Sequence, residues 1–209
     1  MALRYLALGD SYTIGEGVAP AERWTHRLAH ALRAEGIALD DPLTIAATGW
    51  TTDELAAAID AAEPQGRFGF ASLLIGVNDQ YRGRDVTDYR TGFSALLERT
   101  IAFADGRADH VLVLSIPDWG VTPFAAASGR DLAQIVRELD LYNATARATC
   151  DARGVAFVDI TAVSRERGAE PDMLADDGLH PAAAMHAEWM HLALPAARHL
   201  LLQRHARTP

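Results

Sequence analysis

Short apolar runs alternate along this chain with longer segments in which apolar residues recur every three or four positions. Five runs have the length and apolar content of buried strands, at residues 5–8, 43–46, 71–75, 111–116 and 155–158. Five segments carry an apolar stripe at helical spacing, at residues 24–32, 55–62, 86–101, 132–146 and 185–200. Thr51 and Glu54, just ahead of the second segment, match the capping box that starts many helices.

Strands that alternate with helices are typical of βαβ units. The pattern therefore predicts an α/β fold, a three-layer α/β/α sandwich in which helices cover both faces of a five-stranded parallel sheet. No internal repeat, low-complexity linker or change of composition divides the sequence, so we expect one domain over residues 1–209. In open sheets of this kind, ligands bind beyond the carboxyl ends of the strands.

Small and polar residues stand at those strand ends. The first four strands are followed in turn by Gly9-Asp10-Ser11-Tyr12, Ala47-Thr48-Gly49-Trp50, Gly76-Val77-Asn78-Asp79 and Pro117-Asp118-Trp119-Gly120. A fifth group, Asp177-Gly178-Leu179-His180-Pro181, precedes the last helical segment, which we expect to start at its proline. Packing alone does not explain so many polar side chains at one sheet edge, so we expect the functional site there.

Ser11, His180 and Asp177 are the residue types that nucleophilic acyl transfer requires. A serine hydroxyl is a weak nucleophile at neutral pH until a neighbouring base takes its proton. Histidine suits that role, and a carboxylate can fix its tautomer and stabilise the imidazolium ion. The backbone amides of Ser11 and Gly49 and the side-chain amide of Asn78 are available to stabilise a developing oxyanion. The residues thus favour a serine hydrolase.

The same residues carry a family resemblance. In order and spacing, the blocks Gly9-Asp10-Ser11, Gly49, Gly76-x-Asn78-Asp79 and Asp177-x-x-His180-Pro181 resemble the four blocks of the GDSL/SGNH hydrolase family, and they span positions 9 to 181. One departure is Tyr12, which stands where the Gly-Asp-Ser-Leu motif has leucine. Position 12 has no chemical role in the mechanism, so the departure leaves the resemblance intact.

This resemblance implies a flavodoxin-like topology and hydrolysis of an ester or thioester through an acyl-enzyme, without a metal or other cofactor. It implies that Ser11 is the nucleophile, His180 the base and Asp177 the carboxylate that orients the base. Gly49 and Asn78 would complete an oxyanion hole with the Ser11 amide. We therefore expect a serine ester hydrolase acting on a small or short-chain carboxylic ester.

Aromatic residues near these blocks are candidates for the substrate pocket. Trp50 follows Gly49, and Trp119 and Phe124 belong to residues 117–130, a segment rich in small residues that we expect to be poorly helical. An apolar, aromatic rim favours a short acyl chain or an aromatic ester, although sugars also stack on tryptophan. Three arginines after the third block could meet an anionic leaving group or simply face solvent; they are Arg82, Arg84 and Arg90.

Composition removes several other function classes. The 19 basic and 28 acidic residues give a net charge of −9, which argues against a nucleic-acid partner or an anionic membrane surface. All the basic residues are arginine, and the absence of lysine excludes Schiff-base chemistry and Walker-type nucleotide binding. The single cysteine, Cys150, excludes an internal disulfide and a thiolate zinc cluster. With no membrane-span pattern and no signal-peptide core, we expect a cytoplasmic location.

The sequence leaves alternative roles open for single residues and for the whole chain. Ser11 could cap the first helix, His180 could be a buried structural histidine, and Gly49 could serve only a turn. A carbohydrate O-deacetylase or an acyl-thioesterase would use the same residues on a different leaving group. A non-catalytic ligand-binding module on the same fold is the alternative of another class. The oligomeric state is open.

Overall fold

A single parallel sheet organises the protein. The computed structural model describes residues 2–202. Its strands are β1 (Leu3–Gly9), β2 (Leu39–Ala46), β3 (Phe70–Leu74), β4 (Val111–Leu114) and β5 (Ala156–Val158). They lie in the order β2-β1-β3-β4-β5, and each neighbouring pair is parallel. This is the expected five-stranded sheet, with the strand order of flavodoxin-like folds.

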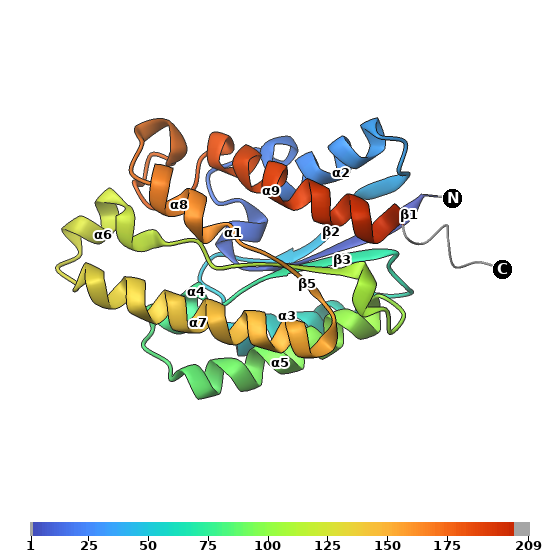
Figure 1. The fold of residues 1–209 in the computed structure, drawn as a ribbon, viewed down its shortest axis with the longest axis horizontal. Coiled ribbons are helices and arrows are strands. Elements are labelled where there is room, and N and C mark those ends of the chain that lie inside the picture. The colour runs from blue at the N-terminus through green and yellow to red at the C-terminus, as the bar shows by residue number, and fades with distance from the viewer. Residues whose placement is uncertain (1, 203–209) are drawn as a thin grey trace.

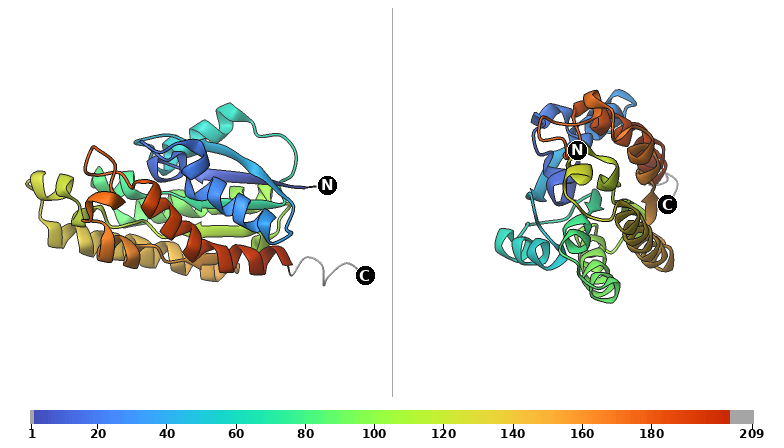
Figure 2. Two further views of the ribbon diagram at one scale, coloured as in Figure 1. Left: turned by 90° about the horizontal axis from the view of Figure 1, so that it is seen from above. Right: turned by 90° about the vertical axis from the view of Figure 1, so that its left-hand side faces the viewer.

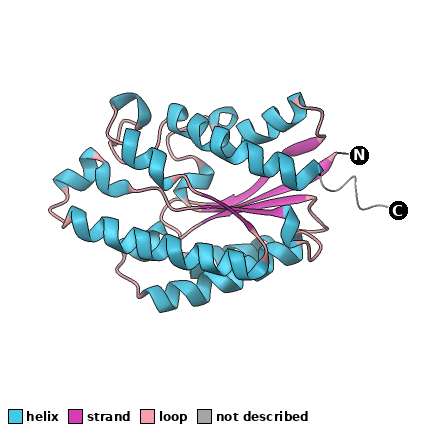
Figure 3. Ribbon diagram, in the orientation of Figure 1, coloured by secondary structure: helices cyan, strands magenta, loops and turns pink. Residues whose placement is uncertain are grey.

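Helices cover both faces of the sheet, so the three-layer sandwich is confirmed (Figure 1). The five expected helical segments are α2 (Trp24–Ala34), α3 (Thr52–Ala62), α5 (Val86–Phe103), α7 (Leu132–Arg153) and α9 (Ala183–Leu202). Helices α2 and α9 pack together on one face, and α3, α5 and α7 cover the other (Figures 1 and 2). Figure 3 shows the strands enclosed between these two helical layers. Within residues 2–202, no helix is both long and apolar enough to cross a membrane.

Two strand boundaries differ from the sequence prediction for identifiable reasons. Strand β2 begins at Leu39 rather than at residue 43, and it includes Pro42, which lies opposite Tyr5 in β1. Proline is tolerated there because β2 is an edge strand. Strand β4 ends at Leu114 rather than at residue 116, since the Asn143 side chain bonds both backbone groups of Ile116, at 2.7 and 2.9 Å.

Several short helices at the carboxyl edge of the sheet were not expected. They are α1 (Ser11–Ile14), α4 (Val77–Tyr81), α6 (Pro123–Ala127) and α8 (Thr161–Arg167). The 3₁₀ turns are Pro20–Glu22, Ala108–His110, Trp119–Val121 and Pro171–Met173, of which Ala108–His110 directly precedes β4. The prediction that residues 117–130 are poorly helical was therefore wrong. Thr122 caps α6 by accepting from the Ala125 N–H at 3.2 Å, and Pro123 occupies its first turn.

The last helix also starts later than predicted. Helix α9 begins at Ala183, while Pro181 pairs with Leu174 in an isolated antiparallel bridge. The bridge places Pro181 outside the helix, and His180 lies in the bend just before it. Leu192, which the helical spacing placed on the buried face, is 43% exposed. The buried face of α9 instead uses Trp189 and the small residue Ala193 one turn later.

A buried histidine joins α9 to the start of α2. His186 has no exposed surface, and its Nδ1 accepts a hydrogen bond of 3.2 Å from the Trp24 N–H. That N–H lies in the first turn of α2, where Arg23 at the N-cap supplies no side-chain cap. His186 therefore caps α2 from a distant part of the sequence. To accept this hydrogen bond, its Nδ1 must carry no proton.

Replacing His186 with asparagine is expected to make folding less sensitive to acid. Burial first, and then the charges of Arg23 and Arg27, lower the pKa of His186 from 6.5 to about 3. Protonation of His186 is therefore less favourable in the folded state than in the unfolded chain. This histidine contributes to the free energy of unfolding above pH 6.5, and that contribution is lost as the pH falls toward 3. Within this range the contribution of His186 to the free energy of unfolding decreases by about 1.4 kcal/mol for each pH unit.

Urea unfolding at pH 6.5 and at about pH 5 measures this difference. The free energy of unfolding should decrease over that interval by about 2 kcal/mol more in the wild type than in His186→Asn, because asparagine keeps an acceptor for the Trp24 N–H and cannot titrate. Other groups titrate equally in both proteins and cancel in the comparison. His191→Asn, a change at an exposed position of α9, should show the same dependence of the free energy of unfolding on pH as the wild type. Equal losses in wild type and His186→Asn would contradict the assignment.

Candidate functional site

Ser11 lies at the first position of α1, directly beyond the end of β1. The turn requires glycine at position 9, because a Cβ there would lie 2.2 Å from Thr13 Oγ1 and 2.4 Å from the Leu74 carbonyl oxygen. The N-cap is Asp10, whose Oδ1 accepts from the Tyr12 N–H at 3.0 Å. Asp10 rather than Ser11 therefore caps the first helix, and the Ser11 hydroxyl makes no hydrogen bond within residues 2–202.

Asp10 has an unusual carboxyl group. It is fully buried, and its Oδ2 has no hydrogen-bond partner in the described chain. Burial is the main cause that raises its pKa to about 8, and the nearby Asp79 adds to the effect. The group is therefore mainly protonated at neutral pH. Burial therefore favours the neutral form of the carboxyl group that precedes Ser11.

Gly49 and Asn78 come from the loops after β2 and β3. Gly49 has a φ of +86°, a left-handed conformation that favours glycine, and its carbonyl accepts from Arg82 Nη2 at 2.7 Å. Asn78 Nδ2 donates to the Trp50 carbonyl at 2.9 Å, which orients its amide and leaves a second N–H. The backbone N–H groups of Ser11 and Gly49 have no acceptor within the described residues. Three donors are thus available near one another.

His180 and Asp177 form a pair within one loop. Their Nδ1 and Oδ2 atoms lie 2.5 Å apart, and Asp177 Oδ1 accepts from the N–H groups of Leu179 and His180, both at 2.9 Å. Burial alone would raise the pKa of Asp177, but these hydrogen bonds outweigh it and hold the pKa below its usual value. An ionised Asp177 requires a proton on Nδ1, which leaves Nε2 of His180 as the nitrogen able to accept one.

A cavity of about 210 Å³ brings these segments together. The residues around it are Ser11, Tyr12, Thr48, Gly49, Val77, Asn78, Tyr81, Trp119, Phe124, Leu179 and His180. Ser11 and His180 face the same space without a hydrogen bond between them, as is common in enzymes without substrate, where such contacts tighten on binding. The cavity combines a serine hydroxyl, an imidazole and hydrogen-bond donors with an aromatic wall.

Part of this wall was predictable from the sequence. Trp119 and Phe124 line the cavity as expected, but Trp50 does not belong to the described residues that line it, because its ring packs against the core. Tyr81 and Leu179 were not predicted. For Tyr81 a signal was present, since it lies four residues after Val77 and would share its face on a helix starting at the Gly76 turn.

The last residue of the Gly-x-Asn-Asp block, Asp79, has a structural role. Asp79 is buried, and its carboxylate accepts from both the backbone N–H and the hydroxyl of Thr52, at 3.0 and 2.8 Å. These bonds fix the start of α4 to the start of α3. Burial still raises the pKa of Asp79 despite them. Asp79 therefore holds the loop that presents Asn78 and does not itself line the cavity.

Solved structures share this fold over nearly their whole length. A structure named TesA aligns with a TM-score of 0.72 and 19% identity, covering 94% of this chain and 99% of that one. The acetylxylan esterase Axe2 from Geobacillus stearothermophilus has a TM-score of 0.69 and 20% identity over 93% and 94% of the two chains. The psychrotrophic esterase EstA from Pseudoalteromonas sp. has a TM-score of 0.64 and 19% identity over 96% and 94%.

A sequence-family comparison gives the chain its classification. No curated protein matches the sequence. The GDSL-like Lipase/Acylhydrolase family model matches residues 7–188, a range that includes all four blocks. The chain belongs to this family and is a carboxylic ester hydrolase of the SGNH type.

Proposed function

We propose that the protein is a serine esterase that cleaves small carboxylic esters through an acyl-enzyme on Ser11. The observation that carries the proposal is the convergence of Ser11, Gly49, Asn78 and His180 from four separate segments on one cavity. Asp177 supports it, because its hydrogen bond with Nδ1 directs the accepting nitrogen of His180 away from the carboxylate. A binding module without catalysis would not need this combination.

In the first half-reaction, Ser11 Oγ attacks the ester carbonyl carbon while His180 Nε2 takes the hydroxyl proton. The carbonyl π electrons move to oxygen, and the oxyanion is stabilised by the Ser11 and Gly49 N–H groups and the Asn78 amide. When the tetrahedral intermediate collapses, the bond to the alcohol oxygen breaks and His180 protonates that oxygen. The alcohol leaves, and the acyl group stays on Ser11.

In the second half-reaction, water repeats the attack. His180 takes a proton from water as its oxygen adds to the acyl carbon, and the same donors hold the oxyanion. Collapse breaks the bond to Ser11 Oγ, which recovers its proton from His180, and a carboxylic acid is released. Asp177 stays ionised throughout and stabilises the imidazolium form of His180.

The lining of the cavity favours an apolar acyl group. Beyond the reacting groups, the wall consists mainly of Val77, Tyr81, Trp119, Phe124 and Leu179. These side chains offer contact area and few hydrogen bonds, which suits hydrocarbon better than a polyhydroxylated sugar. An acetylated carbohydrate of the kind named for Axe2 is thus the second choice, and a thioester would use the same chemistry.

A phosphonate ester with a p-nitrophenyl leaving group tests the proposal directly. It should react once per molecule, release nitrophenol in a single burst and leave a phosphonyl mass on the peptide that contains Ser11. In parallel, p-nitrophenyl esters from acetate to decanoate should be turned over, with the preferred length reporting the depth of the cavity. Labelling at a different residue, or turnover that persists in the fully phosphonylated protein, would overturn the proposal.

A further inference from the structure

Three aromatic side chains form a continuous wall on one side of the cavity. Trp119 is buried, and its ring lies 5.3 Å from that of Tyr81 and 6.3 Å from that of Phe124, measured between centroids. A hydrogen bond of 2.9 Å from the Trp119 indole N–H to Gln80 Oε1 fixes its orientation. Tyr81 and Phe124 are 40% and 36% exposed, so the wall extends from the reacting groups to the solvent.

Arg130 stands against the outer part of this wall. The central carbon of its guanidinium lies 4.1 Å from the centre of the Tyr81 ring and 5.6 Å from that of Trp119. Its Nη1 donates to the Tyr81 carbonyl at 3.0 Å, which holds the group in place. The remaining N–H donors of Arg130 have no acceptor and no carboxylate partner within residues 2–202. This leaves a positioned positive charge facing outward at the aromatic wall.

The neighbouring charges do not neutralise Arg130. The adjacent carboxylate of Asp131 accepts from the Gln134 N–H at 3.1 Å and lies 3.6 Å from Arg137. Most arginines within residues 2–202 form an ion pair with a carboxylate, whereas Arg130 forms none there.

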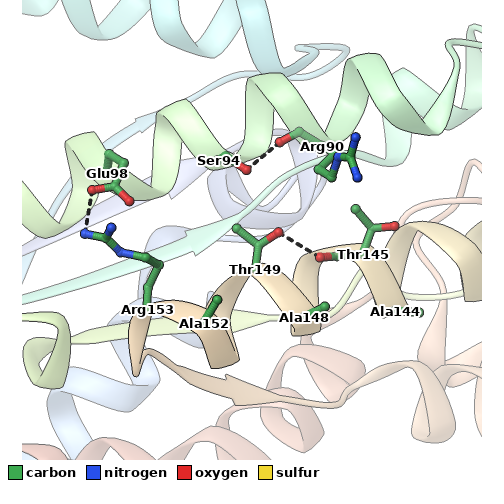
Figure 4. A pocket seen from close by; sticks show the side chains of 9 residues that line it. All are labelled: Arg90, Ser94, Glu98, Ala144, Thr145, Ala148, Thr149, Ala152 and Arg153. Atoms are coloured by element: carbon green, nitrogen blue, oxygen red, sulfur yellow. Dashed lines mark hydrogen bonds and ion pairs between the residues drawn. The ribbon is translucent and has the colours of Figure 1, made fainter.

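Of the three arginines that the sequence suggested for an anion, two are ion-paired and the third lies away from the cavity. Arg82 pairs with Glu54 at 3.1 Å, and Arg84 pairs with Asp53 at 2.5 Å. Arg90 lies on α5 and faces the groove between α5 and α7, on a surface separate from the cavity (Figure 4). Compared with these three arginines, Arg130 alone combines a free charge with contact to the cavity wall.

We propose that the acyl chain of the substrate ends in a negatively charged group, such as a carboxylate, which Arg130 binds. The proposal rests on the esterase function above and names its substrate class. The hydrocarbon part of the chain would lie along Tyr81 and Trp119, with its charged end at the guanidinium. The charged end is assigned to the acyl part of the substrate, and the paired esters below, which differ only in their acyl part, test this assignment.

Matched pairs of esters test this specificity. One series consists of mono-p-nitrophenyl esters of dicarboxylic acids from succinate to suberate, and the other of p-nitrophenyl esters of the corresponding neutral acids. At one chain length the wild type should prefer the charged ester in kcat/KM. Arg130→Gln keeps a polar side chain but removes the charge, and it should lower kcat/KM for that ester by about 10-fold or more. Its effect on the neutral partner should be less than about 3-fold.

A remote arginine provides the matched control. Arg153→Gln removes the same charge from the far part of α7, where Arg153 pairs with Glu98 (Figure 4), and should leave the preference unchanged. Equal losses on both esters in Arg130→Gln would show that Arg130 only supports Tyr81, and would overturn the proposal. So would a wild type that prefers the neutral ester at every length. If phosphonate fails to label Ser11 and no ester is cleaved, it is the esterase function that has failed.

Discussion

Replacing Ser11 with alanine is expected to lower kcat for ester hydrolysis by about 10⁵- to 10⁶-fold. The oxyanion donors and the cavity remain in this variant, but no oxygen is left to carry the acyl group. Residual turnover must then come from direct attack by water. Steady-state kinetics on the best p-nitrophenyl ester, with burst analysis of the wild type, measures the effect. The variant should show neither a burst nor a phosphonylated peptide.

The loss should arise without damage to the fold. The Ser11 hydroxyl makes no hydrogen bond within the described residues, and the cap of α1 depends on Asp10. Thermal unfolding of Ser11→Ala should therefore match the wild type closely. Ser94→Ala is a suitable control, because Ser94 lies on α5 beside Arg90, away from the cavity (Figure 4), and its activity should be unchanged. Substantial turnover by Ser11→Ala would show that another group is the nucleophile.

Replacing His180 with alanine should reduce kcat by a similar factor, about 10⁵-fold or more. Without the imidazole, the Ser11 proton has no acceptor at the cavity, and the leaving alcohol has no acid to protonate it. The loop should keep its shape, since Asp177 still accepts from two backbone N–H groups at 2.9 Å. The measurement is kcat for the same ester, with and without added imidazole, which should restore part of the rate by occupying the vacated space.

Non-additivity distinguishes a shared step from two separate ones. Because Ser11 and His180 act as a unit, the double variant should be no slower than either single variant. His191→Ala, which removes an exposed histidine of α9, should retain full activity. A double variant that loses the product of the two factors would mean that His180 serves a different step from the one assigned to it.

The sheet, and the meeting of the proposed catalytic residues at one cavity, were predictable from the sequence because each depends on local signals. Apolar runs and helical spacing located all five strands and the five long helices. Ser11, Gly49, Asn78 and His180 could be grouped because strand ends of a parallel sheet meet at one edge. Strand order came only from the resemblance to the family, since no local signal states which strands are neighbours.

The aromatic wall of the cavity and Arg130 beside it were less predictable. Trp50 follows Gly49 in sequence, but its ring packs against the core, and only its backbone carbonyl contacts Asn78. Tyr81 and Leu179 join Trp119 from segments far apart in the chain, and only tertiary packing shows that they meet. Arg130 is the last residue of the 117–130 segment. Its proposed role depends on the contact of its guanidinium with the Tyr81 ring, which no pattern of sequence spacing predicts.

A backbone hydrogen bond links the two halves of the site. The Phe124 N–H donates to the Gly178 carbonyl at 3.1 Å, so the short helix α6, which carries part of the aromatic wall, is tied to the turn between Asp177 and His180. If the proposed function holds, an acyl chain that packs against the wall is expected also to restrain the turn that carries His180. A poorly fitting acyl chain is then expected to react slowly even at saturation, because binding energy along the wall is used to align His180.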